Sequence, residues 1–188
     1  MQFYDVIKNR RSIRSFKNTP IERDKLARII DAAMRSPSWK NHTSYSFILV
    51  DNVGEKQALA GAIMNDTQEA TNAIEQAPMV AVVVGEPHDS GVIKDQEYYM
   101  VDGAIAMEHF VLAATNEGYG TCWIASLDEN TVRRTLNIPN NYRVIAMTPV
   151  GETEERKEHH HKKDVREHVF LNQWGEAYTQ NDGFSGIH

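Results

Sequence analysis

The feature that most constrains the fold is a long segment, residues 97–117, that is rich in apolar and small residues and poor in charge. It contains Val101, Ile105 and Leu112 together with several alanines. This composition is typical of a helix that is buried over most of its surface. We therefore predict a central helix here, ended by the glycines of Gly118-Tyr119-Gly120.

The rest of the sequence alternates between segments with helical periodicity and short apolar runs. Leu26, Ile29 and Ile30 lie on one stripe of an amphipathic helix, and the short β-branched or aromatic runs predict strands. The expected strands cover residues 45–50, 79–85 and 142–150, and the further helices cover 21–35, 54–76 and 128–136. This order predicts helices on a small mixed sheet, in a single domain over residues 1–188.

Charge and composition exclude several classes of partner. The net charge of −6 and a pI near 5.7 disfavour a nucleic-acid partner, because binding to phosphate backbones needs a basic face. The apolar runs are far shorter than the ~20 residues that span a bilayer. The single cysteine, Cys122, excludes an internal disulfide framework, and the charged N-terminal segment does not resemble a signal peptide. We expect a cytoplasmic protein without a membrane or nucleic-acid partner.

The densest cluster of charge lies in residues 8–14, where Arg10, Arg11 and Arg14 accompany Ser12 at the expected end of the first helix. Guanidinium groups bind phosphate oxygens bidentately, so this segment favours a phosphomonoester ligand. The alternative is a solvated basic helix end, which the helix macrodipole also favours. A second basic pair, Lys162-Lys163, either joins the same phosphate or solubilises the tail.

Two further segments have the residue types of a cofactor site. Residues 36–41 form a turn-rich loop directly before a strand, with hydroxyls and an amide beside Trp39. Residues 118–125 contain glycines that allow close backbone approach, although they follow a helix and so do not form a GxGxxG dinucleotide fingerprint. Cys122 there is either a redox thiol or a small buried hydrophobic residue.

Together, these three segments resemble the FMN-dependent nitroreductase family. The order matches along the chain: Arg10 to Phe16, Ser36-Pro37-Ser38 with Asn41, the central helix, Gly118 to Ile124, and a basic C-terminal segment. The resemblance implies an α+β fold, a three-layer α/β/α sandwich, in a domain-swapped homodimer. The apolar tail, residues 168–188, is then expected to pack on the partner subunit.

The resemblance also implies roles for particular residues. Arg10 and Ser12 bind the FMN phosphate with support from Arg11, and Arg14 faces the N1/O2 edge of the flavin. Lys162 and Lys163 complete the phosphate site. The remaining expected contacts come from the loop of the other protomer, Pro37, Ser38, Trp39 and Asn41, and from a segment near the N5/O4 edge, Thr121, Cys122, Trp123 and Ile124.

The implied activity is an FMN-dependent oxidoreductase in which NAD(P)H reduces the flavin and a small acceptor, such as a nitroaromatic or a quinone, reoxidises it in a ping-pong cycle. No catalytic side chain and no metal are expected, because the flavin carries the chemistry and adjacent histidines such as His159 to His161 cannot all bind one ion. Two alternatives remain: a non-enzymatic FMN-binding or storage protein, and a same-fold flavin enzyme with another substrate, such as a dehalogenase or a flavin-fragmenting enzyme. The chain departs from the family at Thr43-Ser44-Tyr45 and at the three histidines.

Overall fold

The computed structural model describes residues 1–153 and 164–178. The chain divides into two compact units, Met1–Arg156 and Lys157–His188. The helices of the first unit are α1 (Phe3–Asn9), α2 (Arg23–Met34), the 3-10 helix η1 (Trp39–Asn41), α3 (Val53–Gly61), α4 (Glu69–Gln76), α5 (Tyr99–Asn116) and α6 (Glu129–Thr135). Its strands are β1 (Tyr45–Val50), β2 (Met79–Gly85), β3 (Val92–Ile93), β4 (Gln96–Glu97), β5 (Gly120–Thr121) and β6 (Arg143–Gly151).

The main sheet has the strand order β1-β2-β6-β5, and each neighbouring pair is antiparallel. The expectation of a mixed sheet is therefore wrong for these four strands. Two helices, α3 and α4, connect β1 to β2, and such a pair returns the chain to the end of the sheet that it left. Accordingly Val50, the last residue of β1, pairs with Val80 near the start of β2.

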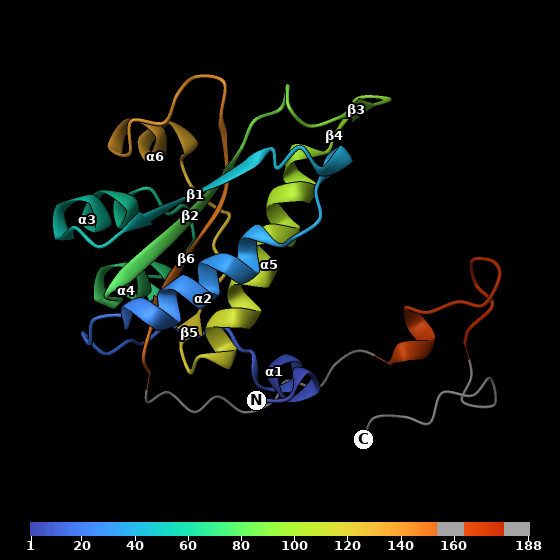
Figure 1. Cartoon of the computed structure of the whole chain (residues 1–188), viewed down its shortest axis with the longest axis horizontal. Coiled ribbons are helices and arrows are strands. Elements are labelled where there is room, and N and C mark those ends of the chain that lie inside the picture. Colours follow the sequence, from blue (N-terminus) through green and yellow to red (C-terminus); the bar gives the residue numbers. More distant parts are fainter. Residues whose placement is uncertain (154–163, 179–188) are drawn as a thin grey trace. The chain divides into compact units, whose positions relative to one another are not determined.

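Helices cover both faces of this sheet, as the expected layering requires (Figure 1). Strand β2 lies in the middle, and its side chains alternate between two cores. Val80, Val82 and Val84 pack on the side of α3, α4 and α6, whereas Ala81 and Val83 pack on the side of α2 and α5. A strand buried on both faces explains why residues 79–85 are almost continuously apolar.

The central helix is confirmed as α5, which packs against α2 and the sheet (Figure 1). Its Gly103 allows a close approach to β6, because a Cβ at that position would lie 2.2 Å from Cδ1 of Ile145. Met100 and Val101 near its N-terminus are about half exposed in the subunit. Among the described residues, no helix combines the length and the apolar character that crossing a membrane requires.

The expected helix over residues 54–76 is two helices instead. The chain leaves the helical conformation after Gly61 because its backbone bonds to residues 126–128: Ile63 bridges Leu127, and the N–H of Met64 donates to Ser126 O at 3.0 Å. Helix α4 then begins at Glu69. The periodicity of the two helices gives no indication of this backbone contact.

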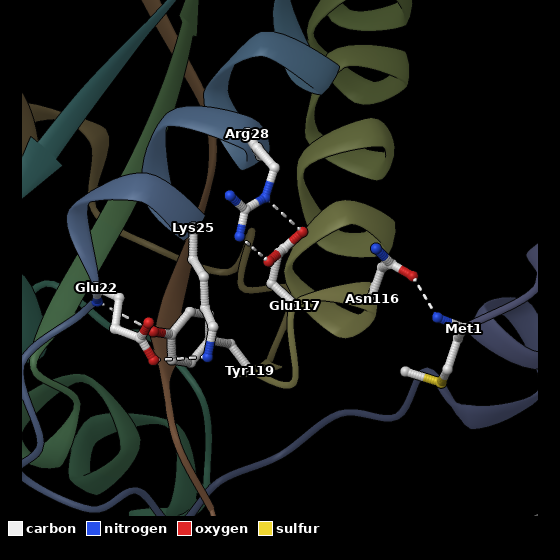
Figure 2. A network of polar contacts seen from close by, with 7 residues as sticks. All are labelled: Met1, Glu22, Lys25, Arg28, Asn116, Glu117 and Tyr119. Atoms are coloured by element: carbon white, nitrogen blue, oxygen red, sulfur yellow. Dashed lines mark hydrogen bonds and ion pairs between the residues drawn. The ribbon is translucent and has the colours of Figure 1, made fainter.

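Polar contacts anchor the N-terminal segments to the C-terminal end of α5 (Figure 2). The Met1 amino group donates to Oδ1 of Asn116 at 3.0 Å, and Arg28 binds both carboxylate oxygens of Glu117 at 3.0 and 2.7 Å. The N–H of Glu22 donates to the hydroxyl of Tyr119. Residues on both sides of the basic segment are therefore held at this end of α5.

The described part of the second unit is a short turn of chain that begins with the 3-10 helix η2 (Val165–Glu167). Phe170 forms a β-bridge with Ala177, and its ring packs on Trp174 with centroids 4.6 Å apart. Leu171 is 44% exposed and Trp174 is 89% exposed. Large apolar surfaces of this kind are typical of a segment that another surface covers. Phe184 of the expected tail lies outside the described residues.

Candidate functional site

The basic segment and the segment after α5, two of the three predicted elements of the site, lie side by side. Ser12 forms a parallel β-bridge with Thr121, and the N–H of Ile13 donates to Thr121 O at 2.8 Å. A Cβ at Gly120 would lie 2.9 Å from Cβ and Cγ1 of Ile13, so only glycine fits beside Ile13 without a shift of one segment. The close approach predicted for these glycines is therefore to the basic segment itself.

The arginines of the basic segment have different surroundings. Arg11 donates from Nη1 to the backbone oxygens of Lys8 and Asn9 at 3.1 and 2.6 Å, so it caps the C-terminus of α1. Arg14 lies 3.3 Å from a carboxylate oxygen of Glu69, the first residue of α4. Arg10 is the half-buried C-cap residue of α1, and it forms no ion pair with another of the described residues. The half-buried Ser12 lies between these cations.

The segment from Thr121 to Ile124 contributes more backbone than side chain to its surface. Thr121, Cys122 and Ile124 are buried, and the N–H of Cys122 donates to Oγ1 of Thr148 at 3.0 Å. Only Trp123 of these four residues is exposed, by 40%. The Cys122 side chain thus occupies the position of a small buried residue, and any ligand contact here falls to the backbone and to Trp123.

The loop over residues 36–44 has an unusual backbone. Lys40, Asn41 and Thr43 have positive φ angles of 46°, 60° and 55°, a conformation that non-glycine residues seldom adopt. The loop holds this shape partly through Ser38, whose Oγ accepts the N–H of Thr43 at 2.9 Å. Pro37 and Asn41 are exposed. Strained conformations of this kind cluster at ligand-binding sites.

Trp39 packs within its own subunit. Its ring lies 4.7 Å from that of Tyr98, and a Cβ at Gly91 would lie 2.1 Å from its indole. These contacts join the loop to the segment that carries the β3–β4 hairpin.

Sequence reasoning missed Asp102, the residue that anchors this loop. One carboxylate oxygen accepts the N–H of Trp39 at 2.8 Å, and the other accepts the hydroxyls of Ser44 and Ser90 at 2.7 and 3.0 Å. Asp102 is 3% exposed. The sequence did contain an indication, because Asp102 falls three residues after Tyr99 and four before Ala106, on the buried stripe of α5. A carboxylate on a buried stripe needs donors around it.

The loop and the basic segment lie at opposite ends of α5. The loop is bound at Asp102, whereas Ser12 bridges Thr121, beyond the other end of the helix (Figure 1). A rise of 1.5 Å per residue separates positions 102 and 116 by roughly 20 Å. A single subunit therefore brings two of the three predicted elements together and keeps the third apart. Lys162, Lys163 and the histidines 159–161 lie outside the described residues.

The fold and these segments define an α+β protein whose antiparallel sheet is flanked by helices, with candidate binding segments at both ends of its central helix. The Nitroreductase family matches residues 7–152. The chain belongs to this family, as its motifs indicated, and the family is one of oxidoreductases.

Solved structures and curated proteins agree with this assignment. A nitroreductase family protein from Clostridium novyi NT is 49% identical with a TM-score of 0.81, over 95% of this chain and 97% of that one. An FMN-dependent nitroreductase from Clostridium difficile is 25% identical with a TM-score of 0.78, over 90% and 98% of the two chains. A Methanothermobacter thermautotrophicus protein, provisionally described as an NADH dehydrogenase/NAD(P)H nitroreductase, is 26% identical over 80% of this chain and 77% of its own.

Proposed function

We propose that this protein is an FMN-dependent NAD(P)H oxidoreductase that reduces nitroaromatics, quinones or similar small acceptors. The register of Ser12 against Thr121 carries the proposal, because it brings the arginine-rich segment beside the 121–124 segment in a chain of this family. Two of the relatives above support the choice of cofactor and reductant. The Clostridium difficile protein is an FMN-dependent nitroreductase, and the Methanothermobacter protein is provisionally described as an NADH dehydrogenase/NAD(P)H nitroreductase.

The residues of the basic segment fit an FMN phosphate. Arg10 supplies a guanidinium, Ser12 supplies a hydroxyl, and Arg11 fixes the end of α1 by binding its last carbonyls. Lys162 and Lys163 are proposed as additional cations. Arg14, already paired with Glu69, would place positive charge near the flavin N1/O2 edge, where it favours the reduced form. Bound FMN would supply the hydride and electron chemistry.

We further propose a homodimer in which each flavin is contacted by both subunits. The separation of the 36–44 loop from the basic segment supports it, since a second copy can bring a loop to the site that its own subunit cannot reach. The exposed apolar side chains of the chain support it as well; they include Phe3, Tyr4 and Ile7 of α1, Met100 and Val101 of α5, and Leu171 and Trp174 of the tail. In this arrangement residues 168–188 pack on the partner, as a swapped tail.

The sequence has no dinucleotide fingerprint that would hold a nicotinamide in a site of its own. We therefore propose that NAD(P)H and the acceptor use one site in turn. Such a cycle gives parallel lines in double-reciprocal plots at several acceptor concentrations.

The test of the cofactor is to reconstitute the purified protein with an equal mixture of FMN and FAD, remove unbound flavin and chromatograph what denaturation releases. We expect FMN alone, because the segment offers one phosphate site. Release of FAD, or of no flavin, contradicts the proposal. A storage protein would also release FMN, but its flavin would react with NAD(P)H no faster than free FMN does.

A further inference from the structure

We propose that Asp102 is a positioning residue that holds the 36–44 loop and the 86–98 segment together as one rigid unit and thereby sets the conformation in which the loop meets the flavin. The first part concerns only contacts within the subunit. The second part rests on the proposed function, since it assumes that the loop contacts FMN.

The carboxylate of Asp102 joins three separate segments. It lies in the first turn of α5, where the helix macrodipole favours a negative charge. Its oxygens bind the loop at two points, where they accept the N–H of Trp39 and the hydroxyl of Ser44. The hydroxyl of Ser90, in the segment that leads to the β3–β4 hairpin, donates to the same oxygen as Ser44.

Other contacts between the loop and the 86–98 segment act alongside Asp102, and they include a direct backbone hydrogen bond from the N–H of Glu86 to Ser44 O at 2.7 Å. The Trp39 indole fills the space beside Gly91 and packs on Tyr98, and a ring nitrogen of His42 lies 2.8 Å from Asp89 O. The hydrogen bond from the Trp39 N–H to Asp102 helps to hold the backbone from which this ring extends. Movement of either segment therefore requires movement of the other.

The loop needs such an anchor because its own backbone is unfavourable. Three of its residues have positive φ angles without being glycine. Conformations of this kind persist only when surrounding contacts determine them. Without an acceptor at position 102, a partly buried N–H and two buried hydroxyls would lose their partner, and the loop would relax toward ordinary backbone angles.

Limited trypsin digestion of the flavin-free protein tests the rigid unit, because each segment carries one cleavage site, at Lys40 and at Lys94. Asp102→Ala should raise both cleavage rates together, by about tenfold or more. Asp102→Asn keeps an acceptor for Trp39, so it should stay within about threefold of wild type. Met107→Ala, a fully buried change on the same helix, controls for general destabilisation and should leave both rates unchanged.

The same variants are then titrated with FMN, and their tryptophan emission is compared with that of wild type before FMN is added. Trp123 and Trp174 contribute to every variant alike, so the difference in emission reports on Trp39. Asp102→Ala should weaken FMN binding by about tenfold and shift the tryptophan emission toward that of an exposed indole, whereas Asp102→Asn should largely restore both. Unchanged cleavage in Asp102→Ala, acceleration at only one site, or equal acceleration in Met107→Ala overturns the rigid unit. Another outcome is that wild type binds no FMN while trypsin cleavage at Lys40 and Lys94 changes as expected. In that outcome the rigid unit is supported, and the proposed role toward the flavin is wrong together with the proposed function.

Discussion

At the scale of single residues, the arginines of the basic segment do not share one task. Arg11 caps α1 and Arg14 pairs with Glu69, so part of the charge that suggested a phosphate is already used within the subunit. The alternative interpretation of the basic segment is an ordinary basic helix end, and Arg11 does have that role. Arg10 and Ser12 are the residues on which the phosphate proposal depends most.

Replacing Arg10 with alanine tests that dependence. The change removes a charge-assisted contact and should weaken FMN binding by about 1.5–3 kcal/mol while the fold is retained. FMN titration by fluorescence quenching measures the loss. Arg134→Ala is the matched control, because Arg134 is an exposed arginine on α6 with a hydrogen bond to Thr131. Equal affinities for the two variants would remove Arg10 from the site.

The sequence offers candidate residues for the site, but it does not predict the contacts between residues. Motifs single out Arg10, Ser12 and Asn41 as candidates because their chemistry is visible in the residue types. Asp102 was missed because a single aspartate in an apolar helix acquires meaning only when Trp39, Ser44 and Ser90 are seen around it. Their positions depend on long-range folding that no local pattern specifies.

At the scale of elements, the strands and the central helix follow from periodicity, because burial on one or both faces dictates residue types directly. Residues 45–50 and 79–85 are strands as predicted. The 54–76 segment was not a single helix, since backbone bonds of residues 62–64 with distant residues end α3. The strand directions also escaped prediction, as they depend on how many helices connect the strands.

The contact between β5 and the basic segment gives an element-scale prediction. Gly120→Ala places a Cβ against Ile13, so the two segments must separate, at a cost of about 1–3 kcal/mol in unfolding free energy and with weaker FMN binding. Urea denaturation and FMN titration measure these effects. Gly61→Ala is the control, because a Cβ there meets nothing within 4 Å. A Gly120→Ala protein as stable and as tightly bound to FMN as wild type would contradict the contact.

The ion pair between α2 and the end of α5 predicts that the stability of the fold depends on pH. The hydrogen bonds from Arg28 hold the pKa of the Glu117 carboxyl below its ordinary value, despite partial desolvation. A lowered folded-state pKa gives stability that is present above the unfolded pKa of about 4.3 and is lost as the pH falls through the folded pKa. The melting temperature of Glu117→Gln should therefore lie below that of wild type at neutral pH and approach it in acid.

Asp31→Asn is the control for this measurement. Its ion pair with Arg35 is exposed on α2, with both side chains more than half accessible, so its loss should change the melting temperature little at any pH. A difference between Glu117→Gln and wild type that does not shrink in acid would assign the effect to something other than this ion pair.

At the scale of the whole molecule, the opposite placement of the loop and the basic segment on α5 supports our proposal that a second subunit completes the site. Mixed dimers test this. One chain carries Arg10→Ala, and the other carries Asn41→Gly, which removes the amide but keeps the positive φ. Each homodimer should bind FMN more weakly than wild type at both sites, whereas the mixed dimer retains one wild-type site and should bind about half as much FMN as wild type with wild-type affinity. Mixed dimers without any wild-type-affinity site would indicate a site built within one subunit.

The central claim is that the protein binds FMN and that NAD(P)H reduces it there. The most direct measurement is anaerobic titration of the FMN-loaded protein with NADH and with NADPH, followed by the visible flavin absorbance. The account predicts complete bleaching by at least one nicotinamide, much faster than for free FMN, and recovery of the absorbance when a quinone is added. Flavin that stays oxidised with both nicotinamides would contradict the proposed oxidoreductase function. It would indicate a protein that binds flavin without NAD(P)H oxidoreductase activity.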